Sequence, residues 1–134
     1  LTIDAWVTEH QLSIRGHRAN IKATFPSPYI EFSDSHYSDK INTTLTRAGY
    51  ARPRASRAQA WPLAVEGKDL ISVAKTGSGK TCGFLLPVFH YHEVNAGSQM
   101  GRGPVKPILL VLAPTRELSV QILEEAQKFG RPLG

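Results

Sequence analysis

The chain of 134 residues is 41% hydrophobic and 20% charged, which is typical of one globular domain and excludes a low-complexity chain. Its single cysteine, Cys82, excludes an internal disulfide and a cysteine-based zinc site, and we expect a reducing, intracellular location in the nucleus or cytoplasm. The formal net charge of +5 suits a polyanionic partner, although many solvated surfaces carry a similar excess.

The first half of the chain is expected to contain an irregular extension followed by two helices. Residues 1–30 form the extension, with one short strand at Gln11–Arg15. From Tyr37 to Ala48 apolar side chains recur at helical spacing, and a glycine follows as a stop. The second helix is predicted over Ser56–Glu66, where Pro62 would bend it or force a break.

The second half of the chain alternates predicted strands and helices. Leu70–Ala74 and Ile108–Ala113 are short apolar runs, as expected of parallel strands buried on both faces. Between them we predict a helix over Lys80–His92, kinked at Pro87, and then a loop over residues 95–107. One more amphipathic helix follows, with apolar positions at Leu118, Ile122, Ala126 and Phe129. This order predicts an α/β fold with a parallel sheet and flanking helices. No apolar run is long enough for a bilayer, so we expect no membrane partner.

A glycine-rich loop joins the first predicted strand to its helix: Ala74-Lys75-Thr76-Gly77-Ser78-Gly79-Lys80-Thr81. It follows the phosphate-loop pattern G-x-x-x-x-G-K-[ST], except that alanine replaces the first glycine. The glycines let the backbone curl, so that successive N–H groups face a β-phosphate. Lys80 would bridge the β- and γ-phosphates, and the Thr81 hydroxyl would ligate Mg²⁺. An ordinary surface turn is the alternative, but the position between a buried strand and a helix favours phosphate binding.

Around this loop the sequence resembles the DEAD-box RNA helicases over nearly its whole length. The loop AKTGSGKT is similar to the family's version, and Pro114-Thr115-Arg116-Glu117-Leu118 resembles its PTREL motif, which contacts the RNA backbone. The residues Gly49-Tyr50, Pro53 and Trp61-Pro62 resemble the segment that cradles adenine, and Phe32 has the spacing of an isolated aromatic residue near the base. The segment Gln11–Phe32 is similar to the entry of the p68-like branch.

The resemblance implies that residues 31–134 are the N-terminal portion of the first RecA-like helicase domain. It further implies ATP and Mg²⁺ as ligands, RNA as partner, and unwinding of RNA duplexes when a second RecA-like domain closes over the nucleotide. At the PTREL motif, Thr115 can cap a helix that begins at Arg116, at the edge of the sheet where ligands of α/β proteins dock. Backbone N–H groups and an arginine there suit a phosphodiester. An ordinary helix cap with a solvated arginine is the alternative.

The segment similar to the adenine site departs from the family pattern at two positions. Arg54 stands where the family has threonine or serine, and Arg57 occupies the glutamine position. Gln59 cannot substitute, because two residues along a helix turn a side chain to another face. Glutamine can accept from adenine N6–H and donate to N7, whereas arginine only donates and matches guanine N7 and O6. Two interpretations stay open: the site tolerates GTP, or Arg57 swings into solvent and the site is weakened.

The sequence contains no D-E-x-D motif, whose acidic residues hold Mg²⁺ and orient the attacking water in this family. Apart from Lys80 and Thr81, we find no candidate catalytic residue. We therefore expect an N-terminal fragment of a helicase, poorly stable alone and without ATP turnover. The alternatives are a truncated, non-catalytic module that binds nucleotide or RNA, and another phosphate-loop NTPase. The latter explains neither the PTREL motif nor the Phe32 spacing.

Overall fold

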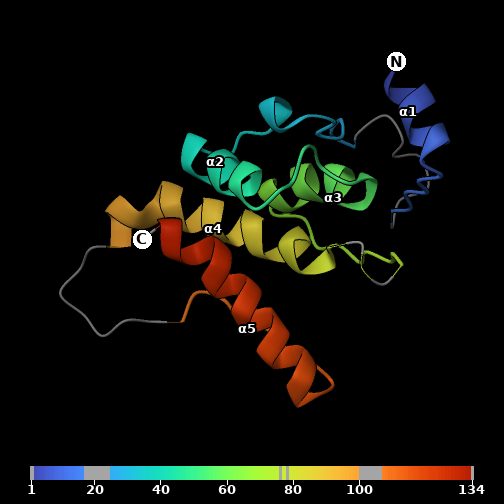
Figure 1. The fold of residues 1–134 in the computed structure, drawn as a ribbon. Helices are drawn as coiled ribbons and strands as arrows, with labels where there is room; N and C mark the ends of the chain where they lie inside the picture. The colour runs from blue at the N-terminus through green and yellow to red at the C-terminus, as the bar shows by residue number, and fades with distance from the viewer. Residues whose placement is uncertain (1, 17–24, 76, 78, 100–106, 134) are drawn as a thin grey trace.

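The computed structural model describes residues 2–16, 25–75, 77, 79–99 and 107–133, and the regular structure of these residues is entirely helical. The elements in chain order are α1 (Ile3–Glu9), η2 (Phe32–Asp34), α2 (Asp39–Arg47), α3 (Ala55–Val65), α4 (Lys80–Gln99), α5 (Arg116–Gly130) and η3 (Arg131–Leu133). Helix α4 contacts both α3 and α5, and α5 runs obliquely away from the stacked helices (Figure 1). No helix in these ranges combines the length and apolar character that crossing a membrane requires.

Helix α2 confirms the first predicted helix. The Ser38 hydroxyl caps it by accepting from the backbone N–H of Ile41 at 3.4 Å. The completely buried side chains of Ile41 and Leu45 lie one turn apart and form its inner face. The chain leaves the helix at Gly49, whose φ of 85° is readily adopted only by glycine.

Helix α3 confirms the second predicted helix to within one residue at each end, but the break allowed for at Pro62 does not occur. Proline lacks the N–H that would bond to the carbonyl four residues earlier, on Ala58. That carbonyl instead accepts from the backbone N–H of Tyr29 at 2.8 Å. Since the tertiary contact satisfies the orphaned oxygen, the helix continues through the proline.

Helix α4 is longer than predicted and continues through Pro87 to Gln99. The predicted loop over 95–107 is therefore wrong at its start, and residues 100–106 lie outside the described structure. Asn95, which we placed in the loop, donates its side-chain amide to the carbonyl of Tyr91 at 2.7 Å. This bond to the preceding turn keeps its polar side chain compatible with the helix.

The N-terminal extension is not wholly irregular, because α1 forms within it. The Thr2 hydroxyl accepts from the N–H of Ala5, and Trp6 is buried and stacked on His10 with ring centroids 4.4 Å apart. The strand expected at Gln11–Arg15 is wrong. Gln11 has a φ of 51° and ends the helical segment, and no ladder forms at the residues after it.

The two predicted strands are the main correction to the fold. Leu70–Ala74 and Ile108–Ala113 are not assigned as strands, and their side chains are largely uncovered, with Ile71 96% and Leu112 85% exposed. A helix completes its hydrogen bonds internally, whereas a strand needs a neighbour to do so. No such neighbour lies in the described ranges. The parallel sheet is therefore absent there, and the apolar side chains of both segments are left exposed.

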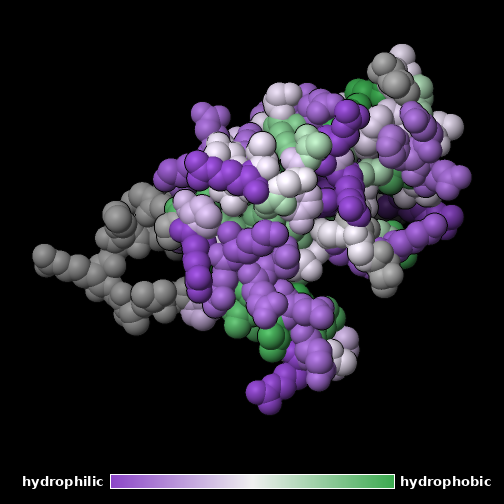
Figure 2. Space-filling model, in the orientation of Figure 1, coloured by the Kyte–Doolittle hydropathy of each residue, from purple (hydrophilic) through white to green (hydrophobic). Residues whose placement is uncertain are grey.

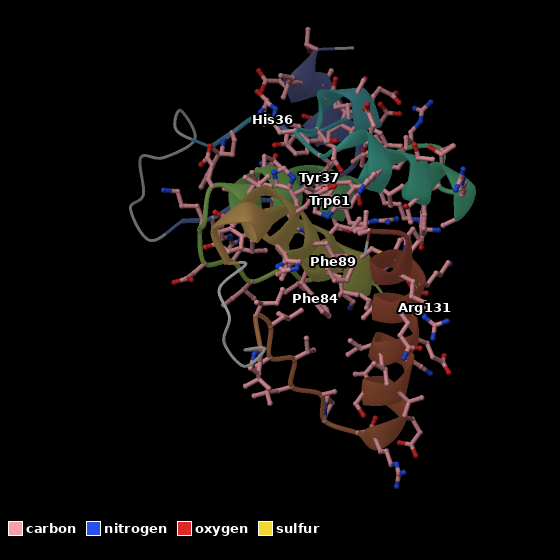
Figure 3. The ribbon with its side chains drawn as sticks, turned by 90° about the vertical axis from the view of Figure 1, so that its left-hand side faces the viewer. His36, Tyr37, Trp61, Phe84, Phe89 and Arg131 are labelled. Atoms are coloured by element: carbon pink, nitrogen blue, oxygen red, sulfur yellow. The ribbon has the colours of Figure 1, made fainter. Side chains whose placement is uncertain are left out.

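The hydrophobic core lies between α2, α3, α4 and the end of α5, around the fully buried Trp61. The ring of Tyr37 meets that of Trp61 edge-on at a centroid distance of 5.3 Å, and Trp61 Nε1 donates to the Cys82 carbonyl at 3.4 Å. Figure 3 shows Tyr37 and Trp61 on one side of α4 and Phe84 on the other. Helix α4 thus separates a closed core from an open face.

Candidate nucleotide-binding site

The phosphate loop is curled between the extended segment Leu70–Ala74 and the first turn of α4. Gly77 and Gly79 both have positive φ values, 75° and 77°, as the glycine pattern indicates. The Lys80 ammonium donates to the carbonyl of Ala74 at 2.6 Å and so closes the loop across its base. Thr76 and Ser78, also predicted to contact nucleotide, lie outside the described residues. The backbone that is described is bent in the way a phosphate-binding loop requires.

The remaining predicted ligands of this loop lie at its two ends. Lys75 and Lys80 are exposed, while Thr81 is half-buried in the first turn of α4. The free N–H groups of that turn and the helix dipole favour an anion at this place. Lys80 can exchange its carbonyl partner for a phosphate oxygen, because its ammonium is already solvated.

Two arginines of the segment similar to the adenine site contact the phosphate loop. Arg54 Nη1 donates to the Gly77 carbonyl at 2.6 Å. The Arg57 guanidinium packs against Gly79, where a Cβ atom would lie 3.2 Å from Arg57 Cζ. A side chain at position 79 is thus opposed both by the positive φ and by Arg57. The structure brings together the two segments that the sequence singled out separately.

Arg57 is 1% exposed, so the interpretation that it swings into solvent is wrong. Its Cζ atom lies 4.8 Å from the ring centroid of Tyr50 and 5.8 Å from that of Trp61. Burial lowers the pKa of the guanidinium. Gln59 turns to another face, as predicted, and donates its side-chain amide to the Pro26 carbonyl at 3.0 Å.

Phe32, the aromatic residue predicted near the base, lies in η2 and is half-buried. Its ring packs on the edge of the core, with its centroid 6.4 Å from that of Trp61. Since Trp61 also contacts Arg57, one buried ring connects two of the residues predicted to contact the base. The nucleotide contact of Phe32 itself stays a prediction.

The PTREL segment has the predicted helix cap. Thr115 Oγ1 accepts from the backbone N–H of Leu118 at 3.2 Å, and α5 begins at Arg116. Pro114, Arg116 and Glu117 are exposed, as is Thr115 itself. These side chains and the first N–H groups of α5 are accessible to a large ligand, and their contact with RNA stays a prediction.

A polar cluster behind the phosphate loop was missed from the sequence. Cys82 Sγ lies 3.5 Å from Glu125 Oε2 on α5 and 3.8 Å from Tyr50 Oη. Burial is the main cause that raises the pKa of the Cys82 thiol to about 11. The cluster connects α5 to the helix that follows the phosphate loop. No sequence signal could reveal it, because its three members meet only through tertiary packing.

A cavity of about 560 Å³ opens on the far side of α4 from the core. Its lining combines basic and apolar side chains, among them Arg57, Lys68, Lys80, Phe84, Tyr91 and Ile108. Hydrophobic side chains are also exposed over α5 and the segment before it (Figure 2). Arg57 and Lys80 therefore share a hollow next to the phosphate loop.

A curled glycine loop that leads into a helix beginning with lysine and threonine defines the class of phosphate-loop proteins. The model of the DEAD/DEAH box helicase family matches residues 54–134, which are more than half of the chain. The chain belongs to the DEAD/DEAH box helicase family.

Individual relatives agree with this assignment. The chain is 39% identical over 132 residues to DEAD-box ATP-dependent RNA helicase 14 of Arabidopsis thaliana, covering 98% of this chain and 20% of that protein. It is 47% identical over 105 residues to DEAD-box ATP-dependent RNA helicase 20 of the same plant, covering 78% of this chain and 20% of that protein. The chain thus spans about a fifth of the length of these relatives.

A solved structure shares the fold. The RNA helicase Prp28 from Chaetomium thermophilum, bound to ADP, is 36% identical and superposes with a TM-score of 0.83, over 98% of this chain and 30% of that one. The predicted resemblance to DEAD-box helicases is confirmed, while the placement in the p68-like branch stays a prediction.

Proposed function

We propose that this chain forms the nucleotide-binding part of an ATP-dependent RNA helicase. The observation that carries the proposal is the curled phosphate loop at the N-terminus of α4, with positive φ at both Gly77 and Gly79. Its bent backbone suits a triphosphate, because the amide N–H groups of such a loop and Lys80 would face the β- and γ-phosphates. The similar helicase Prp28 is bound to ADP, which supports a nucleotide as the ligand of this chain.

Several finer features belong to the same proposal. The segments Leu70–Ala74 and Ile108–Ala113 would join further strands in a RecA-like parallel sheet, which would cover their exposed apolar side chains. The Thr81 hydroxyl would contribute one ligand to Mg²⁺, which neutralises phosphate charge when bound. The PTREL residues, from Pro114 to Glu117, would hold the RNA backbone. A second RecA-like domain would close over the nucleotide and drive unwinding.

The test is calorimetric titration of the chain with a magnesium nucleoside triphosphate. Replacing Lys80 by alanine removes a charge-assisted contact to the phosphates, so we expect at least about tenfold weaker binding. Lys40→Ala is the matched control, because it removes an exposed lysine on α2, away from the loop. Equal binding by wild type and Lys80→Ala would contradict the proposal.

A non-catalytic binding module is the second candidate, favoured by the lack of a D-E-x-D motif in this sequence. Without those carboxylates nothing in the chain orients the attacking water. The 134 residues should therefore bind nucleotide without releasing phosphate, with or without RNA. Phosphate release measured under RNA saturation separates this binding role from a complete ATPase.

A further inference from the structure

The buried guanidinium of Arg57 lies against the Tyr50 and Trp61 rings but has no hydrogen-bond acceptor among the described residues. Its Nε, Nη1 and Nη2 atoms are shielded from solvent, and none has a hydrogen-bond acceptor among the described residues. A guanidinium carries five N–H donors and no acceptor. Leaving such a group desolvated and unpaired is costly, so it requires a physical explanation, of which a bound ligand is one.

In the part of the chain that the structure describes, no carboxylate is positioned to neutralise Arg57. The groups that influence its pKa are Cys82, Tyr50 and a second cation, Arg54, which lowers the pKa further. The Glu125 carboxylate faces the Cys82 thiol instead, with Oε2 3.5 Å from Sγ. Among the described residues, the unused donors therefore lie in a cationic environment, in which a ligand could supply an acceptor.

The position of Arg57 identifies which ligand group it can reach. The guanidinium lies directly against Gly79 of the phosphate loop and beside the Tyr50 ring, and Arg57 is among the residues that line the cavity shared with Lys80. A nucleotide held by its phosphates at this loop must place the rest of the molecule next to the loop. Two parts of a nucleotide can present a pair of acceptors to a planar, two-pronged donor: a phosphate group and, in guanine, the N7–O6 edge of the base.

We infer that Arg57 selects a purine with an acceptor oxygen at position 6, so that the site prefers guanine to adenine. Guanine offers N7 and O6 to paired arginine donors, whereas adenine places its N6 amino group opposite an N–H donor. Glutamine could serve adenine because its amide both donates and accepts. The inference rests on the proposed nucleotide site and names the base that this site takes.

The experiment is calorimetric titration of the full 134-residue chain with the magnesium complexes of GTP, ITP and ATP. Inosine keeps N7 and O6 but lacks the 2-amino group, so it isolates the edge that faces Arg57. We expect GTP and ITP to bind about tenfold more tightly than ATP, the order of discrimination of one bidentate contact. Equal binding of all three, or tighter binding of ATP, overturns the inference.

Two variants assign the preference to Arg57. Arg57→Gln should reverse the ratio of GTP to ATP affinity, with helix content checked by circular dichroism. Arg47→Gln removes an exposed arginine at the end of α2 and should leave the ratio unchanged. A ratio unaffected by Arg57→Gln, or one abolished by Arg47→Gln, contradicts the assignment. If Arg57 binds phosphate instead, Arg57→Gln weakens all three nucleotides equally, which also overturns it.

Failure of this inference can be distinguished from failure of the proposed function. If binding is tight, depends on Lys80 and favours ATP, the inferred guanine preference is wrong but the proposed nucleotide site is supported. Absence of binding for all three triphosphates removes both. The wild-type comparison of ITP with ATP requires no substitution at a buried position, so misfolding of a variant does not affect it.

Discussion

The two sides of α4 are both lined by hydrophobic residues, yet one side is closed and the other is open. Leu86 is completely buried toward α2 and α3, whereas Phe84, two residues earlier, is 38% exposed on the side of the extended segments. Figure 3 shows Phe84 apart from the Tyr37–Trp61 cluster. On the closed side, each helix forms its backbone hydrogen bonds internally, so its apolar side chains can pack against a neighbouring helix. On the open side, the segments lack paired neighbours, so equal hydrophobicity does not lead to burial.

The largest expected effect comes from removing the central ring of the closed side. Trp61→Ala deletes a fully buried side chain that contacts Tyr37 and Arg57, so we expect a loss of about 3–5 kcal/mol in the free energy of unfolding. Urea denaturation followed by circular dichroism measures it.

Leu112→Ala is the matched control on the open side, where the side chain is 85% exposed. A change within about 0.5 kcal/mol is expected, because little apolar contact is lost. If the two variants were equally destabilising, the distinction between a closed and an open side of α4 would be wrong.

The parts of the fold that the sequence predicted are those fixed by neighbours along the chain. The spacing of Ile41 and Leu45 and the glycine after α2 located that helix, and Thr115 marked the start of α5. The errors lie where a distant partner decides the outcome. Helix α3 survives Pro62 because Tyr29 supplies a donor, and the predicted strands do not form because no strand pairs with them in the described ranges.

The same distinction holds for the candidate site. The curl at Gly77 and Gly79 follows from the motif alone, since only glycine readily adopts those φ values. The spacing of residues could not decide whether the Arg57 side chain is buried, because it allowed the side chain to lie in the site or in solvent. Its burial depends on Tyr50, Trp61 and Gly79 meeting around one guanidinium. The thiol cluster of Cys82 with Glu125 is likewise a product of packing.

A smaller effect should appear at the junction of α4 with α5. Burial raises the pKa of Cys82 from its ordinary value of 9.0 to about 11. Because the pKa of the thiol is higher in the folded than in the unfolded chain, the protonated thiol contributes to the free energy of unfolding. This contribution is fully present below pH 9 and is lost as the pH rises through 11. The free energy of unfolding should fall by roughly 1–3 kcal/mol over this pH range.

The measurement is the free energy of unfolding between pH 8 and 11 for wild type and Cys82→Ser, which keeps a small polar side chain that does not titrate in this range. Burial raises the pKa of Tyr50, and its contact with the Cys82 thiol raises that pKa further, so the difference between the curves reports the thiol together with its effect on Tyr50. Parallel curves would show that the folded protein accommodates the Cys82 thiolate. More water would then reach the closed side at this point than the burial of Cys82 indicates.

The smallest expected effect tests where the open side ends. Thr115 lies at the boundary between the exposed segment Ile108–Ala113 and α5, and its hydroxyl accepts from the Leu118 N–H. Thr115→Ala leaves that donor without its cap, so we expect a loss of about 1 kcal/mol in the free energy of unfolding, while Thr115→Ser retains the bond and most of the stability. Urea denaturation of both variants measures it. If alanine and serine behave alike, α5 is held by the packing of Phe129 at its far end, and the local cap does not set its start.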